Sequence, residues 1–326
     1  MQRPRVHLLA HANPIAKDVD RFAFPSLDAY LEFIRGHLPR EFDLTFALPI
    51  LKAVETPDLG GRTDDAARIR DIQGAIDDPA TCAIVALSGG GYFSRILPHL
   101  RLGALARRRR PVLVTGFSEM TNFLNLVAGY RSGRAWYWLC PNYLAWKVSP
   151  PTAARAAFGA FWAMIGAGLA EGAPLPRACP GVLDFPESIT LDVAAGRVSP
   201  GQVRIFGGCL SVLAVLAAWK TRLAVVRPGS WLLIEDVNEA PHRIDRQIAA
   251  LKFAGWLDRL GGVIVGDFHT GDADQKSQTV ELLRYHLRRS VPILTAPHVG
   301  HVWPMAAVPL NRPLRLSATR GRVTIG

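Results

Sequence analysis

Ser118 stands directly after a short apolar run, in the segment PVLVTGFSEMTN (111–122). Residues 112–116 predict a buried strand, and residues 121–127 predict a helix. A serine at a sharp turn from a strand into a helix is the position where α/β hydrolases expose a nucleophile. Serine is also a favoured N-cap of a helix, and on this stretch alone the cap is the better interpretation.

Acidic residues and histidines in the second half of the chain could act together with this serine. The segment WLLIEDVNEAPHRIDRQI (231–248) places Glu235 and Asp236 at the end of a predicted strand, where α/β folds expose functional groups. The segment PILTAPHVGHVWP (292–304) places His298 and His301 in a loop rich in Gly and Pro. A serine hydroxyl needs a base to remove its proton, and a carboxylate orients the imidazole that does so. The alternative for Glu235 is an ordinary ion pair with Arg243 or Arg246.

Other polar segments favour structural roles. The SGGG turn (88–91) is either a tight turn or a phosphate cradle, but no Gly-Lys-Ser/Thr follows it, which disfavours a P-loop. The segment GDFHTGDAD (266–274) has the spacing of neither an EF-hand nor a zinc site, so we expect a solvated loop and no metal. The run Arg107–Arg110 suits the C-terminal end of a helix. It lacks the interleaved aromatic residues of a nucleic-acid site, so no nucleic-acid partner is expected.

The elements that position these residues alternate between strand and helix patterns. Strands are predicted over 6–12, 42–50, 82–87 and 112–116, and helices over 26–38 with Ser26 as cap, over 64–77 and after the SGGG turn. This alternation indicates a parallel sheet covered by helices. The pattern lapses over about 172–200, which is rich in Pro and Gly. We therefore predict a domain over 1–170, a linker over 171–200 and a second domain over 201–326.

Bulk properties place few limits on function. The 326 residues are 49% hydrophobic, and the net charge of +11 suits an acidic substrate as well as other anionic partners. The four cysteines are far apart, so neither a disulfide framework nor a zinc site is indicated. The N-terminus lacks the apolar core of a signal peptide, and the apolar segment 156–170 is short for a bilayer, so we expect a cytoplasmic protein without a membrane partner. The aromatic residues of 136–146 could form core or line a pocket.

Six motifs in order carry a resemblance to a known family. They are Gly90–Tyr92 with Arg95–Pro98, Gly116–Glu119, Gly207–Ser211, Glu235–Asp236 with Glu239 and Asp245–Arg246, Gly266–Phe268, and Gly300–His301 with Pro304. Together they resemble the LD-carboxypeptidases and microcin C immunity peptidases, a family of serine peptidases. The resemblance implies a doubly wound, mainly parallel N-terminal sheet and a smaller, β-rich, barrel-like C-terminal domain. It also implies a homodimer and no cofactor.

The same resemblance implies roles for particular residues. Ser118 is the expected nucleophile, His301 the general base and Glu235 the residue that orients the imidazole. Backbone N–H groups of Glu119 and of Gly90 or Gly91 are expected to bind the oxyanion, and Glu239 and His242 are expected to support the site or contact substrate. The chain departs from the family where Glu119 replaces the usual Asp, where His242 replaces the usual Tyr, at HANPIAKD (11–18) and over 122–150.

These roles imply hydrolysis of an amide bond by way of an acyl-enzyme. The first expectation is an LD-carboxypeptidase that releases the terminal D-Ala of murein tetrapeptides in peptidoglycan recycling. The second is an enzyme similar to the microcin C immunity peptidases that acts on a peptidyl or aminoacyl nucleotide, for which aromatic residues of 136–146 could stack on the base. The third is a binding protein without catalysis on a peptidase fold, which the retention of Ser118, Glu235 and His301 argues against.

Overall fold

The structure is a computed structural model that describes residues 3–54, 63–170, 189–219, 223–319 and 322–326. The chain forms two compact units. The first comprises Met1–Met120, Tyr130–Arg134 and Leu139–Phe185, and the second comprises Thr121–Gly129, Ala135–Trp138 and Pro186–Gly326. Of the linker predicted over 171–200, residues 171–188 lie outside the described part, and the remainder includes a strand, β6 (Ile189–Ala195).

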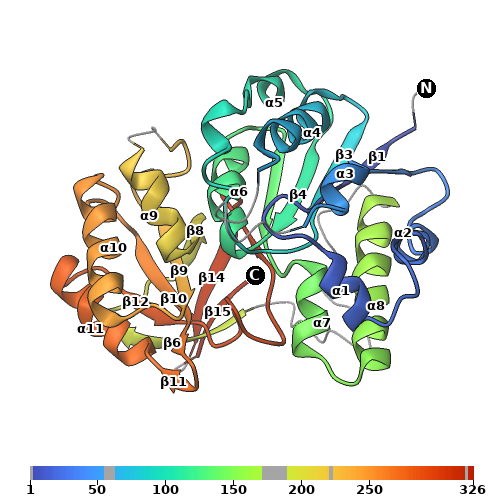
Figure 1. Ribbon diagram of the computed structural model, residues 1–326. Helices are drawn as coiled ribbons and strands as arrows, with labels where there is room; N and C mark the ends of the chain where they lie inside the picture. Colours follow the sequence, from blue (N-terminus) through green and yellow to red (C-terminus); the bar gives the residue numbers. More distant parts are fainter. Residues whose placement is uncertain (1–2, 55–62, 171–188, 220–222, 320–321) are drawn as a thin grey trace. The chain divides into compact units, whose positions relative to one another are not determined.

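The first unit contains a parallel sheet, as the strand pattern predicts. Its strands β1 (Arg5–Leu9), β2 (Asp43–Thr45), β3 (Thr81–Ala86) and β4 (Val112–Gly116) lie in the order β4-β3-β1-β2 (Figure 1). The prediction of a strand over 42–50 is correct only for β2, because a short helix, α3 (Leu48–Leu51), follows it. Pro49 stands in the first turn of this helix, where its missing N–H is not needed.

Helices surround this sheet and bury an aromatic cluster. They are α1 (Ala16–Arg21), α2 (Leu27–Gly36), α4 (Asp65–Asp77), α5 (Gly103–Arg107), α7 (Leu144–Lys147) and α8 (Pro151–Ala170). The predicted cap of α2 is confirmed, because the Ser26 hydroxyl accepts the N–H of Ala29 at 3.1 Å. Helices α2 and α8 lie side by side (Figure 1), and the rings of Tyr30 and Phe33 on α2 contact Phe158 on α8.

Helix α8 contains the apolar segment 156–170. Among the described helices it is the one that is long and apolar enough to cross a membrane. However, 56% of its apolar window is buried inside the protein, and Phe158, Phe161 and Trp162 are fully buried. This burial is typical of a core helix.

The prediction of a helix directly after the SGGG turn is wrong. Residues 88–96 form an irregular loop, and only a short 3₁₀ turn, η2 (Leu97–His99), precedes α5. Gly90 (φ +140°) and Tyr92 (φ +64°) have backbone conformations outside the range of a right-handed helix. The loop is therefore a separate element that tertiary contacts hold in place.

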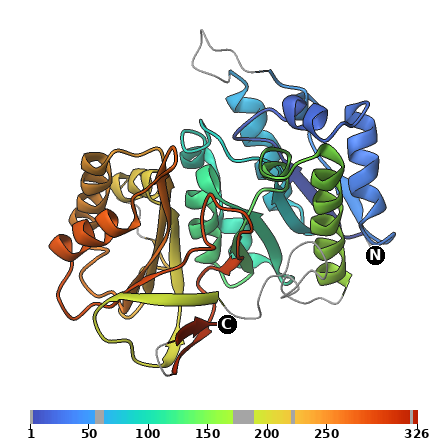
Figure 2. The ribbon, with the colours of Figure 1, turned by 90° about the horizontal axis from the view of Figure 1, so that it is seen from below.

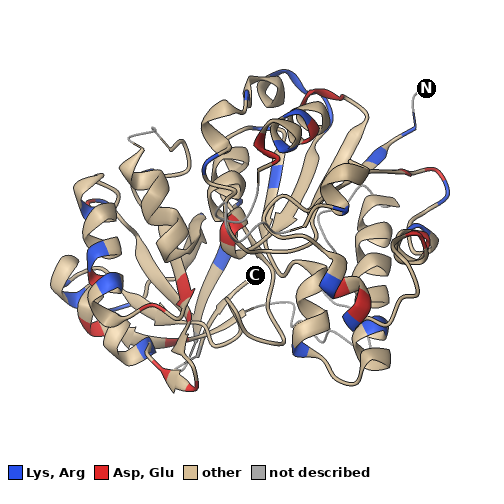
Figure 3. Cartoon of the chain, viewed as in Figure 1, with Lys and Arg blue, Asp and Glu red and all other residues tan. Residues whose placement is uncertain are grey.

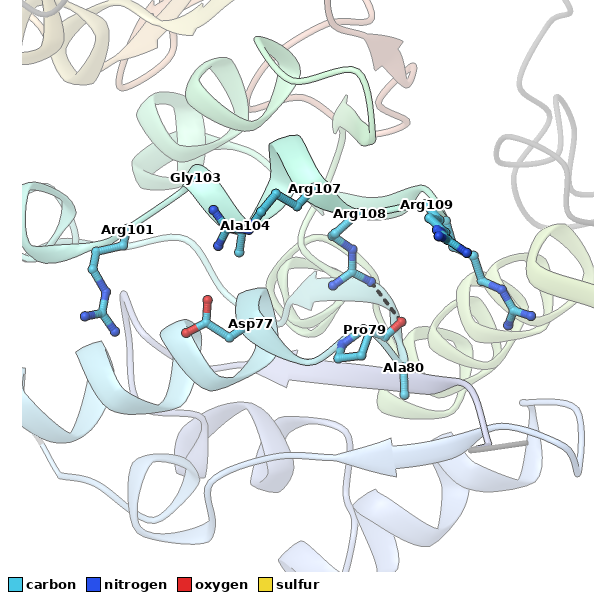
Figure 4. Close-up of a pocket in the computed structure, with 10 residues that line it drawn as sticks. Asp77, Pro79, Ala80, Arg101, Gly103, Ala104, Arg107, Arg108 and Arg109 are labelled. Atoms are coloured by element: carbon cyan, nitrogen blue, oxygen red, sulfur yellow. Dashed lines mark hydrogen bonds between the residues drawn. The ribbon is translucent and has the colours of Figure 1, made fainter.

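The arginine run lies at the end of α5, as predicted, and lines a groove of the first unit. Arg107 is in the last turn of α5, and the guanidinium of Arg108 donates to the carbonyl oxygens of Asp78 at 2.8 Å and Ile76 at 3.3 Å. These carbonyls lie at the C-terminal end of α4, and that of Asp78 also accepts the N–H of Thr81 at 3.1 Å. Figure 4 shows this groove with Arg101 and Arg109 along it, and Figure 3 shows the same basic stretch beside α5.

The second unit contains a mixed sheet that curls until it is nearly closed, in agreement with the barrel-like expectation. Its strands are β6, β7 (Gly201–Val203), β8 (Ile205–Cys209), β9 (Trp231–Val237), β10 (Gly262–Thr270), β11 (Ala273–Asp274), β12 (Ile293–Thr295), β14 (Leu314–Thr319) and β15 (Arg322–Ile325). The order is β7-β14-β15-β6-β12-β10-β9-β8, with β11 paired to β10. The two ends of this path, β7 and β8, are separated by the single residue Arg204, which brings the ends of the sheet together. Figure 2 shows β6 crossing this unit beside the terminal strands.

Strands β8, β9, β10 and β12 of this sheet are parallel, so their carboxyl ends, including Glu235 on β9, meet at one edge. The described residues of the same unit also form the helices α6 (Thr121–Ala128), α9 (Leu210–Ala218), α10 (Pro241–Phe253) and α11 (Lys276–His286). A further strand, β5 (Gly133–Tyr137), pairs antiparallel with β13 (Val308–Pro309), and Tyr137 lies opposite Val308.

Candidate active site

Ser118 lies at a strained turn between β4 and α6. It is the first residue of a 3₁₀ turn, η3 (Ser118–Met120), and its φ is +57°. An N-cap residue has an extended backbone, so this left-handed conformation does not fit the helix-cap interpretation. Gly116 makes the turn possible, because a Cβ there would lie 3.0 Å from Met120 and 3.1 Å from Ala86. A strained, half-buried serine at this position is typical of a nucleophile elbow.

The glycine loop lies against Ser118. A Cβ at Gly89 would be 3.1 Å from the Ser118 Cβ, which shows how close the two backbones approach. At Gly90 a Cβ would overlap the Asn13 carboxamide, and the φ of +140° also favours glycine. At Gly91 a Cβ would meet nothing within 4 Å. The loop therefore carries backbone amides beside the serine, with Gly90 as its most constrained position.

The Glu119 side chain braces the same loop. Its Oε1 accepts the backbone N–H groups of Phe93 and Ser94, both at 2.9 Å. Burial raises the pKa of Glu119 above its ordinary value, although these two donors lower it. The carboxylate thus ties the residue after Ser118 to the C-terminal side of the loop. Ser118, Glu119, Gly90 and Gly91 all belong to the first unit.

A partly buried His301 and a buried Glu235 form a pair in the second unit. The Nδ1 atom of His301 lies 2.7 Å from Oε2 of Glu235, whose residue is fully buried. Because a carboxylate only accepts, Nδ1 carries the proton, and Nε2 is the nitrogen that a general base would use. Gly300 (φ +119°) allows this approach, since a Cβ there would lie 2.7 Å from Oε2 of Glu235. The ion pair of Glu235 is thus with His301, and the alternative with Arg243 or Arg246 is not what the structure shows.

Tyr137 completes the hydrogen bonding of Glu235. Its hydroxyl donates to Oε1 of Glu235, and the tyrosine is itself fully buried on β5. Sequence reasoning missed this contact and left the aromatic residues of 136–146 undecided between core and pocket. The alternating burial of β5 predicts that Tyr137 points inward, but nothing local indicates a partner 98 residues away.

Electrostatics around the pair follow from burial and from neighbouring carboxylates. Burial lowers the pKa of His301, yet the charge and hydrogen bond of Glu235, with smaller effects of Asp236 and Asp267, leave it above its ordinary value of 6.5. Burial and the charge of Glu235 raise the pKa of Asp236 to about 6. Asp236 accepts the backbone N–H of Ser211 at 2.6 Å at the start of α9. Asp236 therefore has a structural partner of its own.

The remaining residues singled out in the sequence lie apart from this pair or have other partners. The carboxylate of Glu239 is half-buried and accepts from Gln247 at 3.1 Å. His242 is exposed in the first turn of α10, and His298 is exposed in its loop. Asp267 is buried and pairs with His269 and, at 3.7 Å, with Lys276, so this part of GDFHTGDAD is not a solvated loop. Among the described residues no group of His, Cys, Asp and Glu could hold a metal ion.

Comparison with family models decides the relationship of the chain. Residues 6–133 match the LD-carboxypeptidase N-terminal domain, and residues 202–316 match the LD-carboxypeptidase C-terminal domain. The chain belongs to the LD-carboxypeptidase family. By this membership it is a hydrolase of the serine-type carboxypeptidase class. The resemblance carried by the six sequence motifs is thereby confirmed.

Individual relatives cover nearly the whole chain. A Streptomyces coelicolor protein named as a carboxypeptidase is 28% identical over 98% of this chain and 93% of its own length. The murein tetrapeptide carboxypeptidase of Pseudomonas aeruginosa is 26% identical over 98% of this chain and 94% of its own length. Among solved structures, the microcin self-immunity protein MccF aligns with a TM-score of 0.69 at 17% identity, over 100% of this chain and 96% of that one. MccF has also been solved in complex with aspartyl sulfamoyl adenosine.

Proposed function

We propose that Ser118, His301 and Glu235 form the catalytic triad of an LD-carboxypeptidase. The observation that carries the proposal is the hydrogen-bonded His301–Glu235 pair, in a chain whose Ser118 occupies a strained strand-to-helix turn. This is the set of groups that activates a serine hydroxyl, because the carboxylate fixes the imidazole and the imidazole accepts the hydroxyl proton. Ser118 and His301 belong to different units, so the proposal requires them to come within hydrogen-bonding reach when substrate binds.

The reaction then proceeds in two steps. Oγ of Ser118 attacks the carbonyl carbon of the scissile amide while Nε2 of His301 takes the hydroxyl proton. The proton passes to the leaving amine, the C–N bond breaks, and an acyl-enzyme remains. A water molecule attacks the ester through the same base, which releases the shortened peptide and restores the serine. No cofactor takes part in the proposed reaction.

Backbone amides of the first unit would stabilise the tetrahedral oxyanion. The N–H of Glu119 follows the nucleophile directly, and the N–H of Gly90 or Gly91 comes from the loop that packs against Ser118. One such donor is worth roughly 2.7–4 kcal/mol in the transition state. We also propose that Glu239 and His242 support the site or contact substrate.

The proposed substrate is a murein tetrapeptide, from which the enzyme releases the terminal D-Ala. The murein tetrapeptide carboxypeptidase relative supports this choice, since its similarity extends over nearly the full chain. The alternative is an aminoacyl or peptidyl nucleotide, suggested by the ligand of MccF. Of the aromatic residues of 136–146, Tyr137 and Trp138 are buried and cannot stack on a base, Trp136 and Tyr143 are half-buried, and the exposed ring of Trp146 has Arg21 over it at 3.3 Å. The similarity to the murein tetrapeptide carboxypeptidase, which extends over nearly the full chain, makes the murein peptide the first proposal.

Mass spectrometry of L-Ala-γ-D-Glu-meso-diaminopimelate-D-Ala incubated with the protein tests the proposal. We expect the parent protein to release D-Ala and Ser118→Ala to release none. Release by both proteins would remove Ser118 from the mechanism. If neither protein releases D-Ala, the murein substrate is wrong, and aminoacyl sulfamoyl adenosines are the next compounds to assay. Failure on both classes would favour a binding protein on a peptidase fold.

A further inference from the structure

Asp18 is a buried carboxylate that the proposed triad does not use. It lies on α1, is only 5% exposed and accepts hydrogen bonds from three side chains. The hydroxyl of Ser88 donates at 2.9 Å, the amide of Asn142 at 2.9 Å and the indole of Trp146 at 2.7 Å. Burial raises the pKa of Asp18, while the three donors lower it. A buried carboxylate with three donors from separate elements holds those elements in register.

One of these elements is the glycine loop beside Ser118. Ser88 is the first residue of that loop, and the preceding Leu87 is fixed by its carbonyl, which accepts the N–H of Asn142 at 3.0 Å. Asn142 therefore contacts both Asp18 and the start of the loop. Tyr30 fixes Asn142 in turn, because its hydroxyl donates to the Asn142 side chain at 2.6 Å. All of these contacts lie within the first unit.

The far side of the loop is held by different groups. The buried guanidinium of Arg68 donates to the carbonyl of Tyr92 at 3.1 Å, and Glu119 accepts the N–H groups of Phe93 and Ser94. Asp18 is therefore the anchor of the N-terminal side of the loop, through Ser88. A glycine adds little conformational restraint through its own residue type, so the amide directions of the glycines between the two anchors depend on both ends as well as on the neighbouring Asn13 and Ser118.

We propose that Asp18 is a positioning residue that holds the 88–91 loop in the conformation from which its backbone amides bind the oxyanion. The inference rests on the proposed function, because it assigns the loop its role in amide hydrolysis. Oxyanion donors act only when they lie within about 2.7–3.1 Å of the developing charge. A misplacement of about 1 Å can lower the rate by about 100-fold. Loss of the anchor should therefore lower kcat without preventing substrate binding.

The test compares Asp18→Asn and Ser88→Ala with a matched control, Asp78→Asn. An Asn at 18 offers one acceptor oxygen to three donors, and an Ala at 88 removes only the link between Asp18 and the loop. Asp78 is a partly buried carboxylate of the same unit that accepts from Arg5 at 2.7 Å and from the N–H of Ala80 at 2.9 Å. It lies just before β3, at the opposite end of that strand from Ser88. Hydrogen exchange of the peptide spanning 87–93 is measured together with kcat and KM.

We expect both anchor variants to exchange faster in 87–93 and to lose at least about tenfold in kcat, with KM within about twofold of the parent value. The double variant should lose no more than the more impaired single variant, because both act through one contact. Asp78→Asn should lose thermal stability but keep its kcat. Unchanged exchange in 87–93, additive losses, or an equal loss of kcat in Asp78→Asn would each overturn the proposal.

The two proposals can fail separately. If the parent protein hydrolyses no amide, the proposed function fails, and the exchange of 87–93 alone decides whether Asp18 anchors the loop. If Asp18→Asn does not fold, Ser88→Ala carries the same test, since it leaves the bonds from Asn142 and Trp146 to Asp18 in place.

Discussion

Replacement of Tyr137 by Phe tests whether the tyrosine hydroxyl holds the Glu235 carboxylate in the position from which it orients His301. The substitution keeps the ring and removes one donor to a carboxylate that is fully buried. A hydrogen bond to a charged group contributes about 1.5–3 kcal/mol, and no water can replace it at a site without exposure. We therefore expect a loss of about 2 kcal/mol in the free energy of unfolding of the second unit.

Activity should fall as well, because of the two side-chain hydrogen bonds described for Glu235 only the one to Nδ1 of His301 would remain. A less restrained carboxylate orients the imidazole less well, and we expect kcat to fall about tenfold, which corresponds to about 1.4 kcal/mol. The assays are urea unfolding followed by tryptophan fluorescence and steady-state release of D-Ala.

A double-mutant cycle with Glu235→Gln separates this contact from general loss of packing. In the Glu235→Gln background the acceptor is neutral, so Tyr137→Phe should cost less than about 1 kcal/mol in unfolding free energy. An equal cost of Tyr137→Phe in both backgrounds would refute the reasoning. It would mean that the tyrosine stabilises the unit through its ring and not through the carboxylate.

Four further predictions concern His301, the glycine loop and Glu119. His301 must be neutral to act as a base, and its pKa is raised, so the acid limb of the pH profile of kcat/KM should have its midpoint above pH 6.5. Glu235→Gln should move this midpoint to lower pH, and a midpoint that does not move would contradict the pairing of His301 with Glu235. The same shift implies that the stabilisation from protonated His301 is complete below pH 6.5 and is lost as pH rises through the folded pKa, which unfolding measured against pH would detect. Gly90→Ala should abolish hydrolysis because it combines steric overlap with a positive φ, while the matched Gly91→Ala, whose Cβ meets nothing within 4 Å, should retain most of the activity; equal losses would contradict this difference. Glu119→Ala should lower the free energy of unfolding by about 2 kcal/mol, since it leaves the buried N–H of Phe93 and the partly buried N–H of Ser94 without their acceptor. A melting temperature equal to that of the parent would exclude this bracing role.

Local sequence patterns were sufficient for strand β4 and helix α4. The run 112–116 is β4 at the predicted bounds, because the continuous apolar stretch Val112–Val114, followed by Thr115 and Gly116, has few alternatives in a parallel sheet. The helix over 64–77 is also correct to within one residue. The SGGG segment failed as a helix start, since contacts with Asn13, Arg68 and Glu119 determine its backbone, and none of these is close in sequence.

The sequence by itself determined the family and the parallel and barrel-like sheets. It also predicted that His301 and Glu235 act together, because ordered motifs preserve residue types along the chain. Only the tertiary structure decided which groups complete the candidate site. Tyr137 reaches Glu235 across 98 residues and Asp18 reaches Ser88 across 70. Such contacts depend on how strands and helices pack within each unit, and hydrogen-bond partners of buried carboxylates are selected by that packing rather than by any periodicity of the sequence.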